Sequence, residues 1–390
     1  MRMHRLKAAF RPALLANHFP ALHGLRVFAI VSVLQFHVTS ELKRVGLLQD
    51  SALARLSTTV FFGMDLFFLM SGFLIGTLIL HAQANKKQNL VRFYVRRGFR
   101  TFPLYYVCLT ILFLAFPTSA TQRSNAIYEY VYLTNYHYPM KVDDLPVMWW
   151  GWSLAVEEHF YLAVPLVMAA MRRVTSHTAR LSLFFIAWCS AFVVRFVTLK
   201  AEHGPRDMEE MFRALYIPTH TRYDILVAGI VLAYLQHHFH VPLRSLLARR
   251  EYRAILGFVA FLGFFLLMQR ELIDDWRMWR IVRWGTLSSI TLTAALLLLL
   301  NTEGRVQRFL SSTVFLHIAT VGYGIYLIHT PVCEHILLPL AGAMVAHGVS
   351  MMAVWPTTLA LLLVLSALGS YVLHITVEKP FLYLRDRLTA

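Results

Sequence analysis

Apolar residues occur along this chain in long runs, and short polar or charged segments separate the runs. A run of about 20 apolar residues forms a helix long enough to cross about 30 Å of hydrocarbon. Ten such runs lie near residues 24–41, 57–81, 102–117, 147–171, 180–199, 222–236, 253–270, 282–301, 312–334 and 351–377. The third and sixth runs are short. The pattern predicts an all-α fold, a polytopic membrane helical bundle with about ten transmembrane helices.

The series of runs is continuous, without a long linker rich in Pro, Gly or Ser and without an internal repeat. We therefore expect one transmembrane domain over residues 23–385 and a cytosolic tail over residues 386–390. Residues 1–22 are basic, but prolines and histidines interrupt them before the first apolar run. We interpret them as a retained cytosolic arm on the anionic leaflet rather than a signal peptide. An arm that docks a partner is the alternative.

The composition supports a membrane protein and excludes a soluble globular one, since 57% of the 390 residues are hydrophobic and the mean hydropathy is +0.55. The net charge of +16 could suggest nucleic-acid binding, but the basic residues form short clusters between apolar runs. With a cytosolic N-terminus, 22 Lys and Arg residues fall on the inner side and 12 on the outer side. This bias predicts that both termini are cytosolic.

Several side chains that are costly to bury in hydrocarbon interrupt these runs. They are Arg26, His37, Asp65, Glu157, Glu158, Arg195 and Arg222. Intramembrane charges face a protein interior or a wet cavity and often mark function, so the chain is predicted to be a membrane enzyme or a transporter. The three cysteines lie in apolar runs without a CxxC motif, and we expect neither a disulfide framework nor a metal site.

The first run contains Arg26 and His37, which are 11 positions apart and therefore share one helix face, about 16 Å apart. A histidine is well suited to take a proton from a hydroxyl near neutral pH. Arg26 is either part of a site or an ordinary residue that extends its charge to the interface. His37 is either a base or a neutral hydrogen-bonded core residue.

The second run, FFGMDLFFLMSGFLIG, holds Asp65 among apolar and small residues. Gly72 and Gly76 are most simply packing residues that let two helices approach closely. An unpaired carboxylate at this depth is costly, so we expect Asp65 to bond an Arg or His on another span.

Arg97 and Arg100 lie at i, i+3 before the third span and can point the same way. Adjacent guanidinium groups suit phosphates, and ordinary positive-inside charge is the alternative.

In the fourth span, Ser153, Glu157 and Tyr161 follow i, i+4, i+8 and form one polar stripe, whereas Glu158 falls on a more apolar line. We expect Glu157 to be the functional carboxylate. The neighbouring tryptophans, Trp149, Trp150 and Trp152, fit an outer interfacial belt.

Three further features have structural rather than catalytic interpretations. Arg222 and Asp224 suggest a local ion pair at the start of the sixth span. Tyr323, Tyr326 and His329 recur at intervals of three and suggest a hydrogen-bonded core cluster. Glu378 in VEKPF could pair with inner arginines.

Together these motifs resemble the acyltransferase-3 family of integral membrane O-acyltransferases, which includes O-acetyltransferases of bacterial surface polysaccharides. The resemblance covers roughly residues 20–385. It depends on the R-x10-H of Arg26 and His37, FFGMDLFFLMSGFLIG, the RxxR of Arg97 and Arg100, YLTNYHYP with Asn135, WSLAVEEHFYLAVP, TRYDILVAG, YGIYLIHTP and VEKPF.

The resemblance implies ten spans, an acyl-CoA donor on the cytosolic side, and an acceptor hydroxyl reached from the outer face. Acetyl-CoA is the default donor, and no metal is implied. Arg97 and Arg100, helped by Arg26, would hold the CoA phosphates, and His37 would act as the general base. Some family members carry an extra periplasmic hydrolase-like domain. This sequence ends after the last span, so we expect the membrane domain or a separate partner to complete the transfer.

Glu157 or Asp65 would orient and stabilise the imidazole of His37, as a carboxylate does for histidine elsewhere. An acyl-enzyme route through His37 or Ser71 is an alternative. Residues expected to contact the acceptor are Ser71, Ser153, Tyr161, Asn135 and Arg222.

The expected acceptor is a carbohydrate or glycolipid, and the expected location is the bacterial cytoplasmic (inner) membrane. A transporter or flippase for a polar or lipid-linked substrate is the rival function, because intramembrane Glu, Asp, Arg and His residues serve as substrate or proton sites there. A non-catalytic scaffold would explain the topology but not the buried charges.

Overall fold

The computed structural model describes residues 19–49, 54, 62–86, 89–137, 145–201, 208–269 and 281–389. Helices are the only regular secondary structure in these ranges, which confirms the predicted all-α class. Most of the predicted basic arm, residues 1–18, lies outside the described residues.

Nine helices of the described chain are long and apolar enough to cross a membrane, and one bent pair brings the number to as many as ten. The spans contain α2 (Ala21–Arg44), α4 (Gly63–Ala84), α5 (Leu90–Ala115), α8 (Trp152–Met171), α9 (His177–Ala201), α13 (Arg250–Met268), α16 (Ser288–Asn301), α18 (Thr313–Val332) with α19 (Leu338–Ala346), and α20 (Met351–Leu373) with α21 (Lys379–Leu388). The bent pair is α11 (Tyr223–His238) and α12 (His240–Ala248). The prediction of about ten spans is confirmed.

Shorter elements lie between or within the spans. The short α-helices are α6 (Ala120–Tyr130), α7 (Thr134–His137), α10 (Met208–Met211) and α17 (Arg305–Leu310). Single 3-10 turns cover Trp149–Gly151 and Thr219–Thr221, and π-helical segments cover Phe212–Tyr216, Val282–Leu287, Cys333–Leu337 and His374–Glu378.

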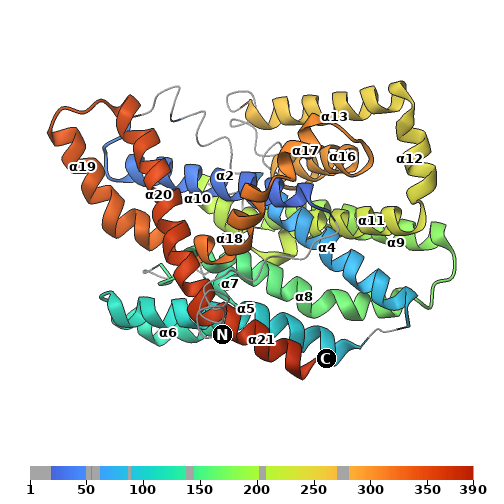
Figure 1. Cartoon of the computed structure of the whole chain (residues 1–390), viewed down its shortest axis with the longest axis horizontal. Coiled ribbons are helices and arrows are strands. Elements are labelled where there is room, and N and C mark those ends of the chain that lie inside the picture. Colours follow the sequence, from blue (N-terminus) through green and yellow to red (C-terminus); the bar gives the residue numbers. More distant parts are fainter. Residues whose placement is uncertain are drawn as a thin grey trace, which may run out of the picture. The chain divides into compact units, whose positions relative to one another are not determined.

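The two short apolar runs have different explanations. The third span is the second half of α5, which begins at Leu90 because its first turns carry arginines whose long side chains extend toward an interface. The sixth run is α11, and α12 turns away from it by 93° (Figure 1). Pro242 lies in the first turn of α12. Proline is tolerated there because the N–H groups of the first turn have no partner within the helix.

The chain forms two compact units. The first unit contains Met1–Gly63, Val91–Ile111 and Gly304–Ala390, and the second unit contains Met64–Leu90 and Leu112–Glu303. The single domain predicted over residues 23–385 stays a prediction.

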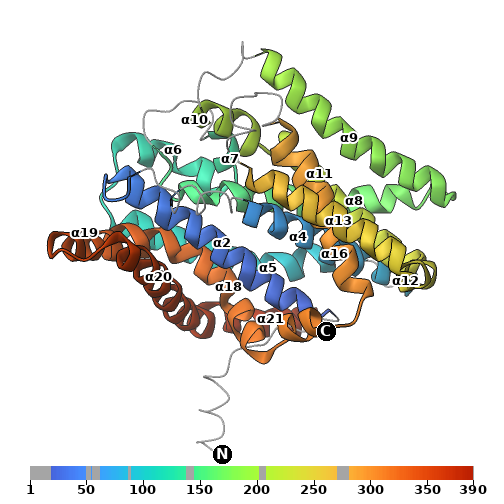
Figure 2. The ribbon, with the colours of Figure 1, turned by 90° about the horizontal axis from the view of Figure 1, so that it is seen from above.

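In the first unit, α18 packs against both α2 and α20 (Figure 2). A glycine makes one of these contacts close, because a side chain at Gly324 would collide with Ser370. The Ser370 hydroxyl donates to the backbone carbonyl of Val321 across the α18–α20 contact. Trp355 on α20 donates from Nε1 to the Thr39 hydroxyl on α2 at 2.9 Å. These contacts fix α2 within its unit.

In the second unit, α4 and α11 cross with their backbones in contact. A Cβ atom at Gly72 would collide with the backbone carbonyl of Leu226, and one at Gly229 would collide with that of Leu69. The packing role expected of Gly72 is therefore confirmed. In the same unit α9 packs on α11, and α13 packs on α16.

The outward surfaces of α9 and α13 are apolar. Phe258 and Phe261 on α13 are 63% and 68% exposed, as expected for side chains that face lipid. In contrast, Trp150 and Trp152 are buried, so they cannot form the exposed interfacial belt that the sequence suggested. Trp152 packs instead against the rings of Phe68 and Tyr216.

Candidate active site

In the first unit, α2 carries both members of the R-x10-H motif on one continuous helix. Arg26 is half-buried, and His37 is buried with 8% of its surface exposed. The His37 ring makes edge contacts with Phe36 and with His329 of α18, whose ring centroid lies 4.8 Å away. The sequence did not predict the second contact.

The same unit contains Arg97 and Arg100 on α5. Both side chains are half-buried and lie one turn apart on the helix. The neighbouring residue Arg96 contacts the C-terminal end of the chain. Its guanidinium group donates to the Thr389 hydroxyl at 2.7 Å and lies 3.5 Å from an Asp386 oxygen. Arg96 is exposed, whereas Arg97 and Arg100 are half-buried.

In the second unit, Glu157 of α8 faces α4. The Ser71 hydroxyl donates to Glu157 Oε1 at 2.5 Å, and the Tyr161 hydroxyl donates to Ser71 Oγ at 3.1 Å. Glu157 and Tyr161 thus share one face of α8, as their spacing predicted. Ser153, one turn earlier, is fully buried. The Glu157 carboxylate, the Ser71 and Ser153 hydroxyls and the Tyr161 phenol offer both proton acceptors and proton donors.

Asp65 forms a fully buried ion pair with Arg222, the residue that precedes α11. An Arg or His partner from another span was expected for Asp65, and this expectation is confirmed. The Arg222 guanidinium also lies over the ring of Tyr216, 4.4 Å from its centroid.

Arg222 and Asp224, which the sequence suggested as a local pair, each make their close ion pair with another residue. Asp224 pairs with Arg195 of α9 at 2.8 Å, and both side chains are buried. The reason is geometric, because side chains two positions apart at a helix start point to different sides. Arg195 lies directly over Gly285, where any side chain would collide with the guanidinium group.

A second polar cluster in this unit surrounds Asn135 of α7. Asn135 is fully buried and donates from Nδ2 to the Thr219 hydroxyl at 2.6 Å. His159 Nδ1 lies 2.8 Å from the same hydroxyl. Tyr136 stacks on His220, which lies outside the spans and whose pKa is lowered by burial.

Sequence reasoning did not identify His159 or Thr219 as site residues. His159 directly follows Glu157 and Glu158 in the motif, and that position was the available signal. Among the outer-loop residues, 138–144 and 202–207 lie outside the described residues.

Two further residues differ from their expected roles. Glu378 accepts a hydrogen bond from His374 at 2.7 Å within a π-helical segment, and this buried contact replaces the pairing with inner arginines that the sequence suggested. Glu129 of α6 was not singled out, yet it is buried and accepts hydrogen bonds from the backbone N–H groups of Val147 and Met148 at 3.0 and 2.7 Å.

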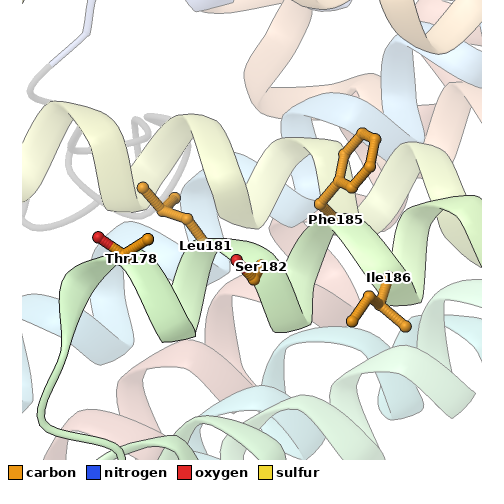
Figure 3. Close-up of a pocket in the computed structure, with 5 residues that line it drawn as sticks. All are labelled: Thr178, Leu181, Ser182, Phe185 and Ile186. Carbon is orange, nitrogen blue, oxygen red and sulfur yellow. The ribbon is translucent and has the colours of Figure 1, made fainter.

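Within the described residues, no group of three or more His, Cys, Asp or Glu side chains is placed to hold a metal ion. A surface depression shown in Figure 3 is lined by residues of α9 alone: Thr178, Leu181, Ser182, Phe185 and Ile186. It contains none of the candidate residues and no acidic, basic or imidazole group, so we assign it no chemistry.

Comparisons with known proteins agree with this arrangement of motifs. The chain is 26% identical over 350 residues to the O-acetyltransferase OatA of Staphylococcus aureus (strain NCTC 8325 / PS 47). This match covers 84% of this chain and 52% of that protein. It is 27% identical over 342 residues to a Bacillus subtilis (strain 168) protein named "Putative peptidoglycan O-acetyltransferase YrhL". This match covers 81% of this chain and 49% of that protein. The chain thus spans about half the length of these relatives. No solved structure matches it.

A family model described as an acyltransferase domain matches residues 19–375, which is most of the chain. This range includes every residue expected to act in catalysis, donor binding or acceptor binding, from Arg26 to Arg222. The chain therefore belongs to the acyltransferase-3 family.

Proposed function

We propose that this protein is a membrane-bound O-acyltransferase of the bacterial cytoplasmic membrane. It moves an acyl group, acetyl by default, from cytosolic acyl-CoA to a hydroxyl of a carbohydrate or related acceptor. The observation that carries the proposal is the family match over residues 19–375. Its similarity to proteins named O-acetyltransferases supports acetyl as the group transferred.

The donor would bind at the arginines of the first unit. Arg97 and Arg100 lie one turn apart on α5, and paired guanidinium groups bind phosphate through short charge-assisted hydrogen bonds. Arg26 lies on α2 in the same unit, about 16 Å of helix from His37. The long pantetheine arm of CoA would carry the thioester from the arginines toward His37.

In the reaction, His37 removes the proton from the acceptor hydroxyl as the oxygen attacks the thioester carbonyl. The new C–O ester bond forms, the C–S bond breaks, and the CoA thiolate leaves and takes up a proton. Burial of His37 is compatible with this role, because a site closed to water limits transfer of the acyl group to water.

The residues expected to contact the acceptor lie in the second unit. The Glu157, Ser71 and Tyr161 chain and the buried Asn135 provide donors and acceptors suited to a substrate with several hydroxyls. Ser153 and Arg222 complete the proposed acceptor set. A cell-envelope carbohydrate agrees with the peptidoglycan named for the Bacillus subtilis relative.

The first test is binding of acetyl-CoA to the detergent-purified protein by calorimetry. We expect micromolar affinity that falls by about 10-fold or more in the Arg97→Ala/Arg100→Ala double variant, which loses two charge-assisted contacts. The matched control is Arg96→Ala on the same helix, since Arg96 contacts Thr389 and Asp386.

The control should bind acetyl-CoA as the wild type does. Equal weakening in the control and the double variant would contradict a specific phosphate site. A folded wild type that binds no acetyl-CoA would contradict the acyl-CoA donor and favour the transporter alternative.

A further inference from the structure

The contact between His37 and His329 joins two histidines that are far apart in the chain. Both belong to the first unit, on α2 and α18, which pack together. Their ring centroids lie 4.8 Å apart with the planes inclined by 63°. His329 is fully buried and His37 nearly so. Two imidazoles enclosed between two spans need hydrogen-bond partners that define which ring nitrogens carry protons, because an uncompensated buried charge or polar group is costly.

The backbone fixes the protonation of His329. Its Nδ1 lies 2.6 Å from the carbonyl oxygen of Tyr326. A carbonyl only accepts hydrogen bonds, so Nδ1 carries the proton and donates it to this bond. In the neutral ring Nε2 is then an acceptor. Nε2 has a single lone pair, and the Thr330 hydroxyl lies 3.2 Å from it, at the long end of the hydrogen-bond range.

Helix α18 is irregular near His329. Pro331 is inside α18 and has no N–H, so it removes one hydrogen bond from the helical series. The chain then continues as the π-helix Cys333–Leu337. Irregular helical turns of this kind occur frequently at functional sites.

A general base must present an unprotonated nitrogen to its substrate and tolerate a positive charge after proton transfer. In a neutral imidazole one nitrogen carries the proton, and the partner of that N–H decides which nitrogen is left free. An adjacent acceptor therefore both selects the tautomer and stabilises the imidazolium, as a carboxylate does in hydrolytic triads. Neutral imidazole can supply the same acceptor without a second buried charge.

We propose that His329 is a positioning residue for His37. His329 Nε2 accepts the N–H of His37, and the other ring nitrogen of His37 is thereby left unprotonated toward the acceptor hydroxyl. After proton transfer, the same contact stabilises the His37 imidazolium. His329 would fill, within the first unit, the role that the sequence suggested for Glu157 or Asp65. This inference depends on the proposed function of His37 as the base.

Two amide variants separate this role from a purely structural one. His329→Gln places an amide oxygen near the position of Nε2 and keeps the acceptor, but loses the bond to Tyr326. His329→Asn keeps an N–H near the position of Nδ1 for Tyr326, but does not reach the position of Nε2. A positioning role predicts that kcat of the Gln variant stays within about 10-fold of the wild type, whereas kcat of the Asn variant falls by about 100-fold. The KM for acetyl-CoA should be unchanged in both.

The measurement is release of free CoA from acetyl-CoA by the detergent-purified protein, with a peptidoglycan disaccharide or water alone as acceptor. Thr39→Val is the matched control, because Thr39 is a buried residue of α2 that bonds Trp355. This control should lower the Tm without changing kcat.

The outcomes distinguish the two levels of the proposal. If His37→Ala abolishes CoA release but His329→Asn equals the wild type, or exceeds His329→Gln, the positioning role is wrong and the base assignment stands. If folded His37→Ala retains full release, or the wild type releases no CoA, the proposed function itself fails and this inference fails with it.

Discussion

At the scale of single residues, the pair of Asp65 and Arg222 is a buried charge contact within the second unit, with both side chains fully enclosed. The low dielectric of such a site makes the loss of either partner expensive. The same unit also contains an exposed pair, Arg244 and Glu303, whose atoms lie 2.8 Å apart. The two pairs allow the effect of burial to be measured directly.

Arg222→Ala should lower stability by about 3–5 kcal/mol, because it leaves the Asp65 carboxylate buried without its partner. The Asp65→Asn/Arg222→Met double variant, which removes both charges, should recover most of the loss. Arg244→Ala is the control and should cost about 0–1 kcal/mol. Thermal unfolding in detergent measures all three. Equal Tm values for Arg222→Ala and Arg244→Ala would contradict the stabilising role of the buried pair.

Glu129 provides a pH-dependent test outside the membrane spans. Burial raises the pKa of its carboxyl from the ordinary 4.5 to about 7, although the N–H groups of Met148 and Val147 partly oppose the shift. The folded protein therefore binds this proton more tightly than the unfolded chain does. The contribution is fully present below about pH 4.5 and is lost as pH rises to about 7.

The expected loss across this pH window is on the order of 3 kcal/mol. The Tm of the wild type minus the Tm of Glu129→Gln should therefore fall between pH 4.5 and 7 and level off above it. The comparison cancels the contributions of the other titratable groups, because both proteins contain them. Parallel Tm curves for the two proteins would show that Glu129 does not titrate in this window.

Much of the candidate site could be predicted at this scale. The cost of burying charge identified Asp65, Glu157 and His37 from the sequence alone, and it required a partner for Asp65. The choice of partner could not be predicted, since Arg195 and Arg222 are both intramembrane arginines and only packing separates them. His329 was assigned to a core cluster because its contact with His37 lies on another span.

At the scale of helices, the crossing of α4 and α11 depends on two glycines. Gly72→Ala and Gly229→Ala each place a methyl group against a backbone carbonyl, which cannot rotate away. We expect each to destabilise the protein by about 1–3 kcal/mol or more. The control is Gly257→Ala on α13, where an added Cβ has no neighbour within 4 Å. Alanine favours helix there, so the Tm should stay the same or rise slightly.

Fluorescence-detected size exclusion after heating would rank the three variants. An unchanged Tm for Gly72→Ala and Gly229→Ala would mean that the backbones do not meet as described.

The spans themselves follow from run length and hydropathy, which is why their number and approximate positions could be predicted. The bend between α11 and α12 and the burial of Trp150 and Trp152 could not. Hydropathy describes what a segment avoids, not which neighbours it packs against. Tryptophan is common both at lipid interfaces and in protein cores, so its position in the sequence does not distinguish these environments.

At the scale of the whole chain, local patterns contain little information about which distant segments pack together. Apolar runs gave no reason to divide the chain, whereas the structure assembles its first unit from three separate stretches. The pairing of α2 with α18 is the clearest example, because these helices meet although most of the sequence lies between them.

This discontinuity has a consequence for biosynthesis. The second unit lies between residues 64 and 303, so all of it is translated before the last stretch of the first unit exists. His37 and His329 are separated by 292 residues. At translation rates of about 5–20 residues per second, α2 waits roughly 15–60 s in the membrane before α18 is made. During that delay the face of α2 that packs on α18 lacks its partner, and an insertase or chaperone that shields it would increase the yield of folded protein.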